Sequence, residues 1–519
     1  MKPPQEVQEQ QDGVRVAETV TSSWSKNSLI AVYICMWLMY FVQALQSSLT
    51  ASLSAYITSD FEGHSLLTVI GIVTNIMGAA CTMPVAKILN LWNRTVGVVV
   101  VMLLVSIIGL ILMARCHDIA MYCAAQAFYN VGLTGLIFCV DVLTSDTSSM
   151  RNRGLAFAFT SSPYMITALA GSLLSERFNT VNWRWAYGCV VIILPAVTVP
   201  LIVTWELAKR KVEKNLVLEK ARSGRTWTQS AWYYFIEFDV VGILVGIFLL
   251  IAGFSFFLLA FVLAESQANK WQSASIICMI VVGGVMIYER FVAPKPFIPY
   301  HLLSSRTIIG ACLLVLTYQI AYYCWNSYFT SHLQVVYDAS MTQAGYISAI
   351  FDFVSPLWLF GAGHLVRVTG RFKCPGHSIG YMCMCEVFIG FGGGTIILLE
   401  QIAVIAASSH NDYASMLASL ALFGNIGSAI GNSISGAIWT NTLPAETRDK
   451  WEEIANSLDV QLSYEMGSAT REAINHAYAV RQRNMSIAGT PVMALTMVWV
   501  FMIKDIRVKG MNHVKGVVF

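Results

Sequence analysis

The chain carries little charge: only 12% of its 519 residues are charged, against roughly 25% in a typical soluble domain. Apolar residues make up 56%, and the mean hydropathy is +0.60. Water cannot solvate a surface so poor in ionisable side chains, which excludes a soluble enzyme. The net charge of +3 gives no electrostatic basis for binding nucleic acid, and 12 cysteines are too few for a disulfide scaffold. The composition therefore predicts a polytopic membrane protein.

An apolar signal sequence is also missing. Residues 1–28 are polar and contain no apolar h-region, so we expect no cleavable signal peptide. The first apolar run after this tail would act as a signal anchor.

Long apolar runs are abundant, each close to the roughly 20 residues that a helix needs to cross the hydrocarbon core. They are too long and too continuous for the strands of a membrane barrel. The sequence predicts an all-α polytopic membrane protein with thirteen spans: 29–50, 65–86, 95–114, 119–140, 155–175, 183–205, 240–263, 274–288, 307–329, 344–366, 378–406, 413–439 and 484–503.

Basic residues orient these spans. With a cytoplasmic N-terminus, the inner segments up to the tenth span carry seventeen Lys and Arg, whereas the outer loops carry four. The positive-inside rule therefore places the tail and the long charged linker in the cytoplasm.

The number of spans conflicts with this rule near the C-terminus. The segment after the tenth span and the tail after 503 are both basic, but an odd number of spans cannot place both termini inside. The stretch 378–409 would be about 48 Å long as a helix, which is long for one crossing and too short for two. One span is therefore either merged with another or missing.

The spans fall into two bundles with an added pair between them. This is the plan of large major facilitator transporters, whose halves are repeats around a midplane site. We expect these parts: cytoplasmic tail 1–28, six-helix bundle 29–205, cytoplasmic linker 206–239, extra helix pair 240–293, C-terminal bundle 307–503 with a polar loop of short amphipathic helices at 440–483, and tail 504–519.

Three acidic residues lie within predicted spans: Asp352, Glu386 and Glu400. Ionisable groups are costly inside a membrane, so each is a candidate for taking and releasing one proton per transport cycle. The alternative is a neutral, hydrogen-bonded acid that holds two helices together.

Uncharged polar and aromatic side chains within spans are the candidates for lining a substrate cavity. Tyr318, Tyr322 and Trp325 share one helical face, which favours stacking on a ligand, although an interfacial aromatic belt is the alternative. Gly427 and Gly431 have the spacing typical of close helix packing. The predicted cavity residues are Gln43, Gln46, Asn75, Tyr129, Asn130, Tyr318, Gln319, Tyr322, Trp325, Asn425 and Asn432.

Metal and cofactor sites are not expected. Cys374, Cys383 and Cys385 are close in sequence, but the last two lie in an apolar run, where free cysteine behaves as a small hydrophobe. No catalytic cluster and no phosphate-binding glycine loop is present in the sequence.

Several runs resemble one transporter family. They are DTSSMRNRGLAFAFTSSP at 146–163, NWRW at 182–185, TGRF at 369–372, FGGG at 391–394, EQ at 400–401 and GAIWTNTLP at 436–444. In this order they are similar to the fungal siderophore–iron transporters, a proton-coupled branch of the major facilitators. The resemblance covers about 29 to 508. The turn after the second span also resembles the major facilitator signature, with Asn90 in place of its acid.

The resemblance implies a symporter that imports ferric siderophores with protons, across the plasma membrane or an endosomal or vacuolar membrane. We expect a monomer in the lipid bilayer. The resemblance favours Glu400 among the acids. It implies conformational-loop roles for Lys87, Arg94, Asp146, Arg151 and Arg153, and substrate contacts in the outer loop for Tyr464, Arg471 and Tyr478. A solvated helical loop is the alternative for the last three.

The family has fourteen spans, which implies that the eleventh is absent here, between Lys373 and Ser378. A dropped exon in a gene model or a real truncation would explain this. Two other functions remain open: a proton-driven exporter of drugs, toxins or peptides, and a sensor that binds without transport. Export is disfavoured because Ser172 follows Gly171 where exporters carry a Gly-Pro motif.

Overall fold

The fold is seen in a computed structural model, which describes residues 24, 26–61, 63–91, 96–149, 151–215, 229, 305–369, 382–408, 412–441 and 457–504. The predicted extra helix pair 240–293 and most of the linker lie outside the described residues, as do the tail 505–519 and part of the polar loop.

The first half contains the six predicted spans. Its helices are α2 (Lys26–Asp60), α3 (Leu67–Leu91), α4 (Val96–Arg115), α5 (Ile119–Thr147), α6 (Arg153–Ser161) with α7 (Pro163–Val181), and α8 (Arg184–Asn215), and the short 3-10 helix η1 (His64–Leu66) joins α2 to α3. The fifth predicted span is divided at Ser162 because Pro163 has no N–H to continue the helix and begins a new one. Helix α8 runs on into the predicted linker.

The described part of the second half is also built from helices joined by short connections. Its helices are α13 (Arg306–Asn326), α14 (Phe329–Tyr337), α15 (Met341–Ser348), α16 (Ile350–Thr369), α17 (Met382–Ala406), α18 (Tyr413–Asn441), α20 (Leu458–Leu462) and α21 (Ala469–Met502). In the described part of the chain, ten helices are long and apolar enough to span a membrane, and a shorter apolar helix covers Phe391–Ala406. The all-α membrane architecture is therefore confirmed.

The last span differs from its prediction. We expected it to begin at 484, after a loop of short amphipathic helices, but α21 begins at Ala469. Of those short helices, the described part contains α20 alone. The polar first turns of α21 remain helical because their Arg and Tyr side chains pack against α14 and α20.

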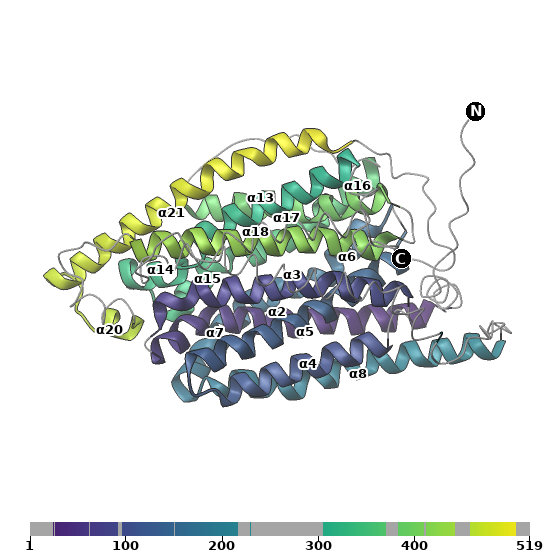
Figure 1. Cartoon of the computed structure of the whole chain (residues 1–519), viewed down its shortest axis with the longest axis horizontal. Helices are drawn as coiled ribbons and strands as arrows, with labels where there is room; N and C mark the ends of the chain where they lie inside the picture. Colours follow the sequence, from purple (N-terminus) through teal and green to yellow (C-terminus); the bar gives the residue numbers. More distant parts are fainter. Residues whose placement is uncertain are drawn as a thin grey trace.

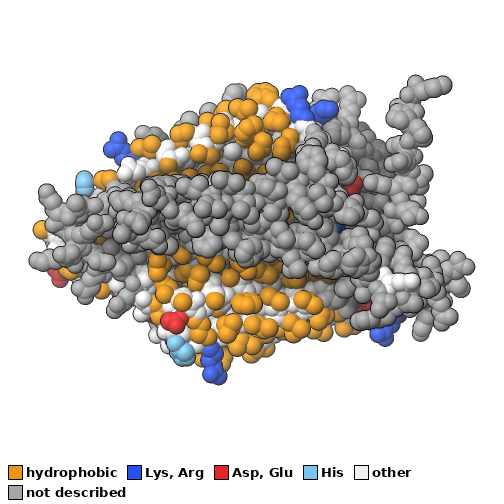
Figure 2. Space-filling model, in the orientation of Figure 1, with side chains coloured by type: hydrophobic (Ala, Val, Ile, Leu, Met, Phe, Trp, Pro, Cys, Tyr) orange, Lys and Arg blue, Asp and Glu red, His pale blue; other side chains and the backbone are white. Residues whose placement is uncertain are grey.

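The helices run along one axis (Figure 1). We call the end with Lys26, Arg153 and Arg306 the inner end, because the positive-inside rule predicts that it faces the cytoplasm. The end with Asp60, η1 and α20 is the outer end. Figure 2 shows hydrophobic side chains along the helices and basic ones towards the two ends. Large apolar residues such as Ile192 and Met497 are about 70% exposed, as expected for lipid contact.

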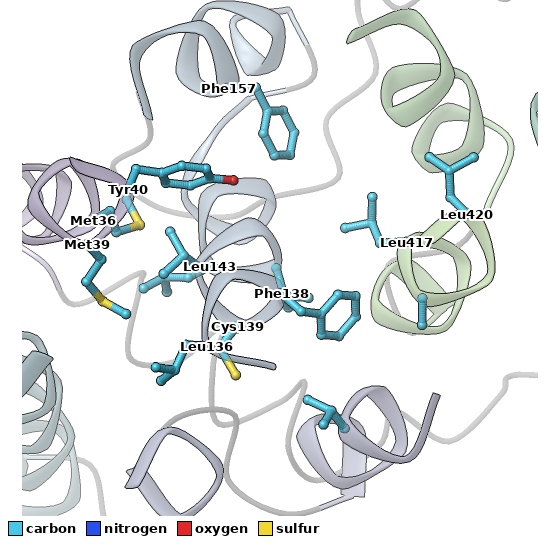
Figure 3. Packing of buried hydrophobic residues seen from close by; sticks show 14 of the residues in the cluster. Met36, Met39, Tyr40, Leu136, Phe138, Cys139, Leu143, Phe157, Leu417 and Leu420 are labelled. Atoms are coloured by element: carbon cyan, nitrogen blue, oxygen red, sulfur yellow. The ribbon is translucent and has the colours of Figure 1, made fainter. Parts of the chain in front are cut away.

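Helix α18 joins the two halves. A Cβ on Gly427 or Gly431 would lie 2.5 or 2.7 Å from a carbonyl oxygen of α13, which confirms close packing at these glycines. On its other side α18 packs against α3, where Gly71 faces Asn432. Figure 3 shows buried residues of α5 and α18 facing each other, with Phe138 directed towards Leu417.

Helices α16 and α17, consecutive in the chain, run in the same direction. Phe351 lies against Gly393, Ser355 lies against Gly394, and Trp358 donates a hydrogen bond to Thr395 at 2.7 Å. The residue numbers of the two helices therefore rise together.

As a result, Thr369 and Met382 lie at opposite ends of the bundle. In an alternating bundle, another helix would connect two such ends. The geometry thus supports the interpretation that one span is absent here, which stays a prediction.

Candidate transport cavity

A cavity of about 230 Å³ lies between the two halves. Helices α2 and α7 and the start of α3 line it from the first half, and α13 to α16 with α18 line it from the second. Its wall is rich in hydroxyl and amide groups, including those of Ser47, Ser52, Tyr164, Asn326 and Asn432. Such a wall offers many hydrogen bonds to an uncharged polar ligand.

Helix α2 contributes a face of small residues. Ser47, Ser48, Ala51, Ser52 and Ala55 recur at helical spacing and all line the cavity. These residues were not among the predicted cavity residues. The signal was the run ALQSSLTASLSA at 44–55, in which small and hydroxyl-bearing side chains interrupt an otherwise apolar span.

Two breaks in the second half open onto the cavity. The first separates α13 from α14 at Ser327, and the second separates α15 from α16 at Ala349; both residues line the cavity. The Ser327 hydroxyl lies 3.0 Å from Asn432 Oδ1, which ties the first break to α18. In membranes, irregular backbone is tolerated only where it is buried in protein or lines a cavity.

Among the described residues that line the cavity, Asp352 is the only one with a carboxylate. It lies in the first turn of α16, directly after the second break. The rings of Tyr164, Tyr322 and Tyr323 line the same cavity. Asp352 therefore places one ionisable group in a wall that is otherwise neutral.

The other acids lie elsewhere. Glu400 of α17 is 3% exposed and lies close enough to Cys312 of α13 to interact with it electrostatically, but it does not line the cavity. Glu386 lies in α17, and its side chain is outside the described residues.

Asp141 is an acid that sequence reasoning missed, because the fourth span was expected to end at 140. Helix α5 continues to Thr147, and the Asp141 carboxylate accepts a hydrogen bond from the Tyr40 hydroxyl of α2. The polar but uninterrupted run after 140 was the available signal.

Among the predicted cavity residues, Tyr322 and Asn432 line the cavity. Gln43 lies just behind its wall and accepts a hydrogen bond at 2.8 Å from Tyr164, which lines it. Trp325 and Tyr318 pack on either side of Tyr322, with ring centroids 5.6 and 6.3 Å away. The predicted aromatic stripe is thus continuous, but only its central ring reaches the cavity.

The remaining predicted residues lie at helix contacts. Gln46 donates to Thr50, and Asn75 donates to the Gly71 carbonyl. Asn130 accepts from Thr134. Asn130 and Asn425 approach Gly78, Tyr129 packs on Gly109, and Gln319 packs on Gly427. Their roles in substrate binding stay predictions.

The conformational-loop candidates gather at the inner end. Arg153 is fully buried and donates to the carbonyl oxygens of Ser145 (2.7 Å) and Ser148 (3.1 Å). Its guanidinium lies 5.1 Å from the ring centroid of Tyr413, at the start of α18. Asp146 is 3% exposed, Lys87 is half-buried and Arg151 is exposed, whereas Arg94 lies outside the described residues.

The outer-loop candidates form a compact junction. Arg471 of α21 is fully buried and donates to the carbonyls of Val335 (2.9 Å), Gln461 (2.8 Å) and Tyr464 (3.3 Å). Tyr478 donates to Gln461 Oε1 at 2.6 Å. These side chains fasten α20 and α14 to α21. The Arg471 guanidinium is therefore not part of a solvated loop.

Comparison with known proteins agrees with this architecture. A family model described as Major Facilitator Superfamily matches residues 36–385. A bacterial homologue of the human lysosomal transporter Spinster superposes with a TM-score of 0.55 at 12% identity, covering 92% of this chain and 97% of that one. The human organic anion transporter MFSD10 (TETRAN) gives 0.53 at 10% identity, with 92% and 99% covered. The fold is therefore that of a major facilitator transporter and not of an enzyme.

Sequence relatives identify a particular family within the major facilitator superfamily. MFS siderochrome iron transporter D of Aspergillus fumigatus is 51% identical over 547 positions, covering 99% of this chain and 90% of the relative. Siderophore iron transporter mirB of Emericella nidulans is 44% identical, with 98% and 89% covered. The chain belongs to the siderophore iron transporter family of the major facilitator superfamily, as its motifs predicted. The 547 aligned positions exceed the 519 residues of this chain, so at least 28 positions of the first relative have no counterpart here.

Proposed function

We propose that the chain imports ferric siderophores together with protons, by opening its central cavity alternately to each side of the membrane. The observation that carries this proposal is the cavity between the halves, whose described wall offers hydroxyl and amide groups and the carboxylate of Asp352. Family membership supplies the substrate class, because the relatives are named for siderochrome or siderophore iron.

The wall chemistry suits such a cargo. In a ferric siderophore the chelator already occupies the coordination positions of the iron. The protein then has to bind the outside of the chelate, through hydrogen bonds and ring contacts from residues such as Tyr322, Asn326 and Asn432. Siderophore iron is therefore substrate in this proposal and not a resident metal.

Entry requires the halves to separate. The cavity of about 230 Å³ is smaller than the 300–1,000 Å³ of most ligand sites. Contacts between the halves hold them together at both ends: Arg153 with Tyr413 at the inner end, and Ser59 Oγ accepting from the Leu458 N–H (3.0 Å) at the outer end. When one half rocks against the other, the contacts at one end would break while those at the opposite end persist.

Asp352 is our choice for the coupling proton. A carboxylate in a neutral, water-poor wall costs free energy when ionised, and protonation removes that cost. Substrate in the cavity excludes water and strengthens this linkage. Protonation from outside and release inside would thus accompany each cycle. Asp352 shares the cavity with substrate, whereas Glu400 does not.

The test is uptake of radioactive iron as ferric hydroxamates in fungal cells that lack siderophore uptake. We expect accumulation that rises at acidic external pH and collapses with a protonophore, from a chain at the plasma membrane. Accumulation that ignores the protonophore would refute the proton coupling. Substrate binding without uptake would favour a sensor, and resistance to toxins would favour an exporter.

A further inference from the structure

At the outer end, one histidine lies within a cluster of aromatic rings and an arginine. We call this set the outer box: His64, Tyr328, Trp439, Tyr478 and Arg481. The ring of His64 lies 5.9 Å from that of Tyr328 and 6.0 Å from that of Trp439. Tyr328 and Trp439 stack at 4.0 Å, and the Arg481 guanidinium lies 4.3 Å from a Trp439 ring centroid.

The outer box lies next to the outer part of the cavity wall. Ala55 and Leu67 line the cavity and also pack in the hydrophobic cluster that contains Tyr328, Trp439 and Tyr478. The box therefore packs against residues of the cavity wall, and a displacement of the box would change the outer side of that wall.

The box is shared between the halves. His64 belongs to η1, which connects α2 to α3 in the first half, whereas the other four residues lie on the second half. Separation of the halves at the outer end therefore withdraws His64 from its partners and exposes its ring to water.

His64 is poorly suited to carry a proton while the box is closed. It is fully buried, and neither ring nitrogen makes a hydrogen bond of good geometry within the described part of the chain. The pKa of His64 is lowered from 6.5 to about 4, chiefly because the ring is buried and also because of the charge of Arg481, while the Ala55 carbonyl opposes the shift.

The titratable groups that face His64 from neighbouring elements also disfavour a proton on its ring while the box is closed. Arg481 and Tyr478 come from α21, Tyr328 from the junction of α13 and α14, and the Ala55 carbonyl from α2. His332 lies one ring further away, 6.4 Å from Tyr478. Arg481 is the charged group that acts on His64, and its charge opposes protonation.

We propose that His64 is a proton-binding site of the outer gate, and that its protonation from the external medium opens the box. A charged imidazolium cannot remain buried opposite Arg481, so it is stabilised only where the halves have parted and water enters. The outward-open state would therefore be favoured on the acidic side of the membrane. This site would act in addition to Asp352. The inference relies on the proposed import function only to explain what the gate is for.

The pH dependence of the open-to-closed ratio follows from the difference in the pKa of His64 between the two states. The neutral ring of His64 favours the closed box, and the protonated ring favours the open box. In the open box the pKa of His64 returns towards 6.5. Closure is therefore stable above pH 6.5 and weakens as the pH falls towards 4. Between pH 7.5 and pH 5 the open-to-closed ratio should rise roughly 25-fold.

The experiment measures the gate without substrate. Fluorophores are placed through non-canonical amino acids at Val181 and Tyr337, which are 81% and 61% exposed at the outer ends of α7 and α14. Single-molecule energy transfer in liposomes then reports separation of the two halves. For the unmodified chain we expect the open population to grow as the external pH falls from 7.5 to 5.

Three variants test whether His64 carries the pH response of the outer gate. His64→Gln should remove the pH response, and Arg481→Gln should reduce it, because the opposing charge is lost from the closed box. His117→Gln, a change at an exposed histidine of the same end, should leave it intact. A response that persists in His64→Gln, or no response in the unmodified chain, would overturn the inference. Because no siderophore is used, failure here is distinguishable from failure of the import proposal.

Discussion

The guanidinium of Arg153 lies over the ring of Tyr413, 5.1 Å from its centroid, and so links α6 of the first half to α18 of the second. Arg153 is held in place by carbonyls at the end of α5. The contact therefore joins a rigid corner of one half to the first turn of a helix that lines the cavity from the other.

Weakening this contact should favour opening at the inner end. Tyr413→Leu removes the ring face and should cost the closed inner end about 1 kcal/mol, or roughly fivefold in the equilibrium between states. Tyr413→Phe keeps the ring and is the matched control. The measurement is labelling of an inner-end residue in inside-out vesicles. Equal labelling of Leu and Phe variants would show that the ring contact has no role in closure.

Asp352 should be required for proton-driven accumulation but not for exchange. In Asp352→Asn the cavity stays neutral throughout the cycle, so a pH gradient can no longer drive net uptake. Exchange of labelled for unlabelled siderophore across the membrane should persist, because it needs no net proton movement. Net uptake and exchange are compared in the same vesicles. Loss of both would point to a substrate-binding role instead.

Glu400 offers a contrast with Asp352. Glu400→Gln keeps the shape of a buried side chain that lies outside the cavity, so we expect net uptake within about threefold of the unmodified chain. If Glu400→Gln loses net uptake while exchange persists, the coupling proton belongs to Glu400, as the sequence resemblance favoured.

Arg471 should be a structural residue of the outer end. Arg471→Met leaves the carbonyls of Val335, Gln461 and Tyr464 without their donor, which should cost about 3 kcal/mol of stability. Arg471→Lys should recover only part of it, since one ammonium cannot reach all three oxygens in the geometry of a guanidinium. Thermal unfolding in detergent measures the effect, with Arg483→Met, an exposed position on α21, as the control. Equal unfolding temperatures for the two Met variants would contradict it.

Much of the fold could be predicted from apolar length alone. Each described span coincides with a predicted run because lipid demands about 20 apolar residues per crossing. The internal breaks could not be predicted in this way: hydropathy does not register the interruption at Ser327, where the backbone is held by contacts to α18. The early start of α21 was missed for a related reason, since the partner of its buried Arg471 is a tertiary surface.

The site was harder to predict than the fold. Amides and tyrosines within spans were expected to line the cavity, yet Gln46, Asn75 and Asn130 form hydrogen bonds within their own helices. The cavity is lined instead by small residues like Ser47 and Ala51, which leave room for a ligand because they fill little volume. One sequence reveals the polarity of a side chain, but the face that a helix presents to its neighbours depends on packing.

The parallel course of α16 and α17 leads to a prediction about the chain itself. The Aspergillus fumigatus relative carries at least 28 positions that this chain lacks, enough for one membrane helix, and we predict that they fall between Thr369 and Met382. Inserting the corresponding helix of the Aspergillus fumigatus relative should place Lys26 and the tail after Lys504 on the same side of the membrane, whereas an odd number of spans places them on opposite sides. Protease protection of tags at these two positions measures this. The inserted chain should also accumulate siderophore iron faster at equal surface level. If insertion lowers both stability and uptake, the chain is complete with its present helices and connects α16 to α17 without a further span.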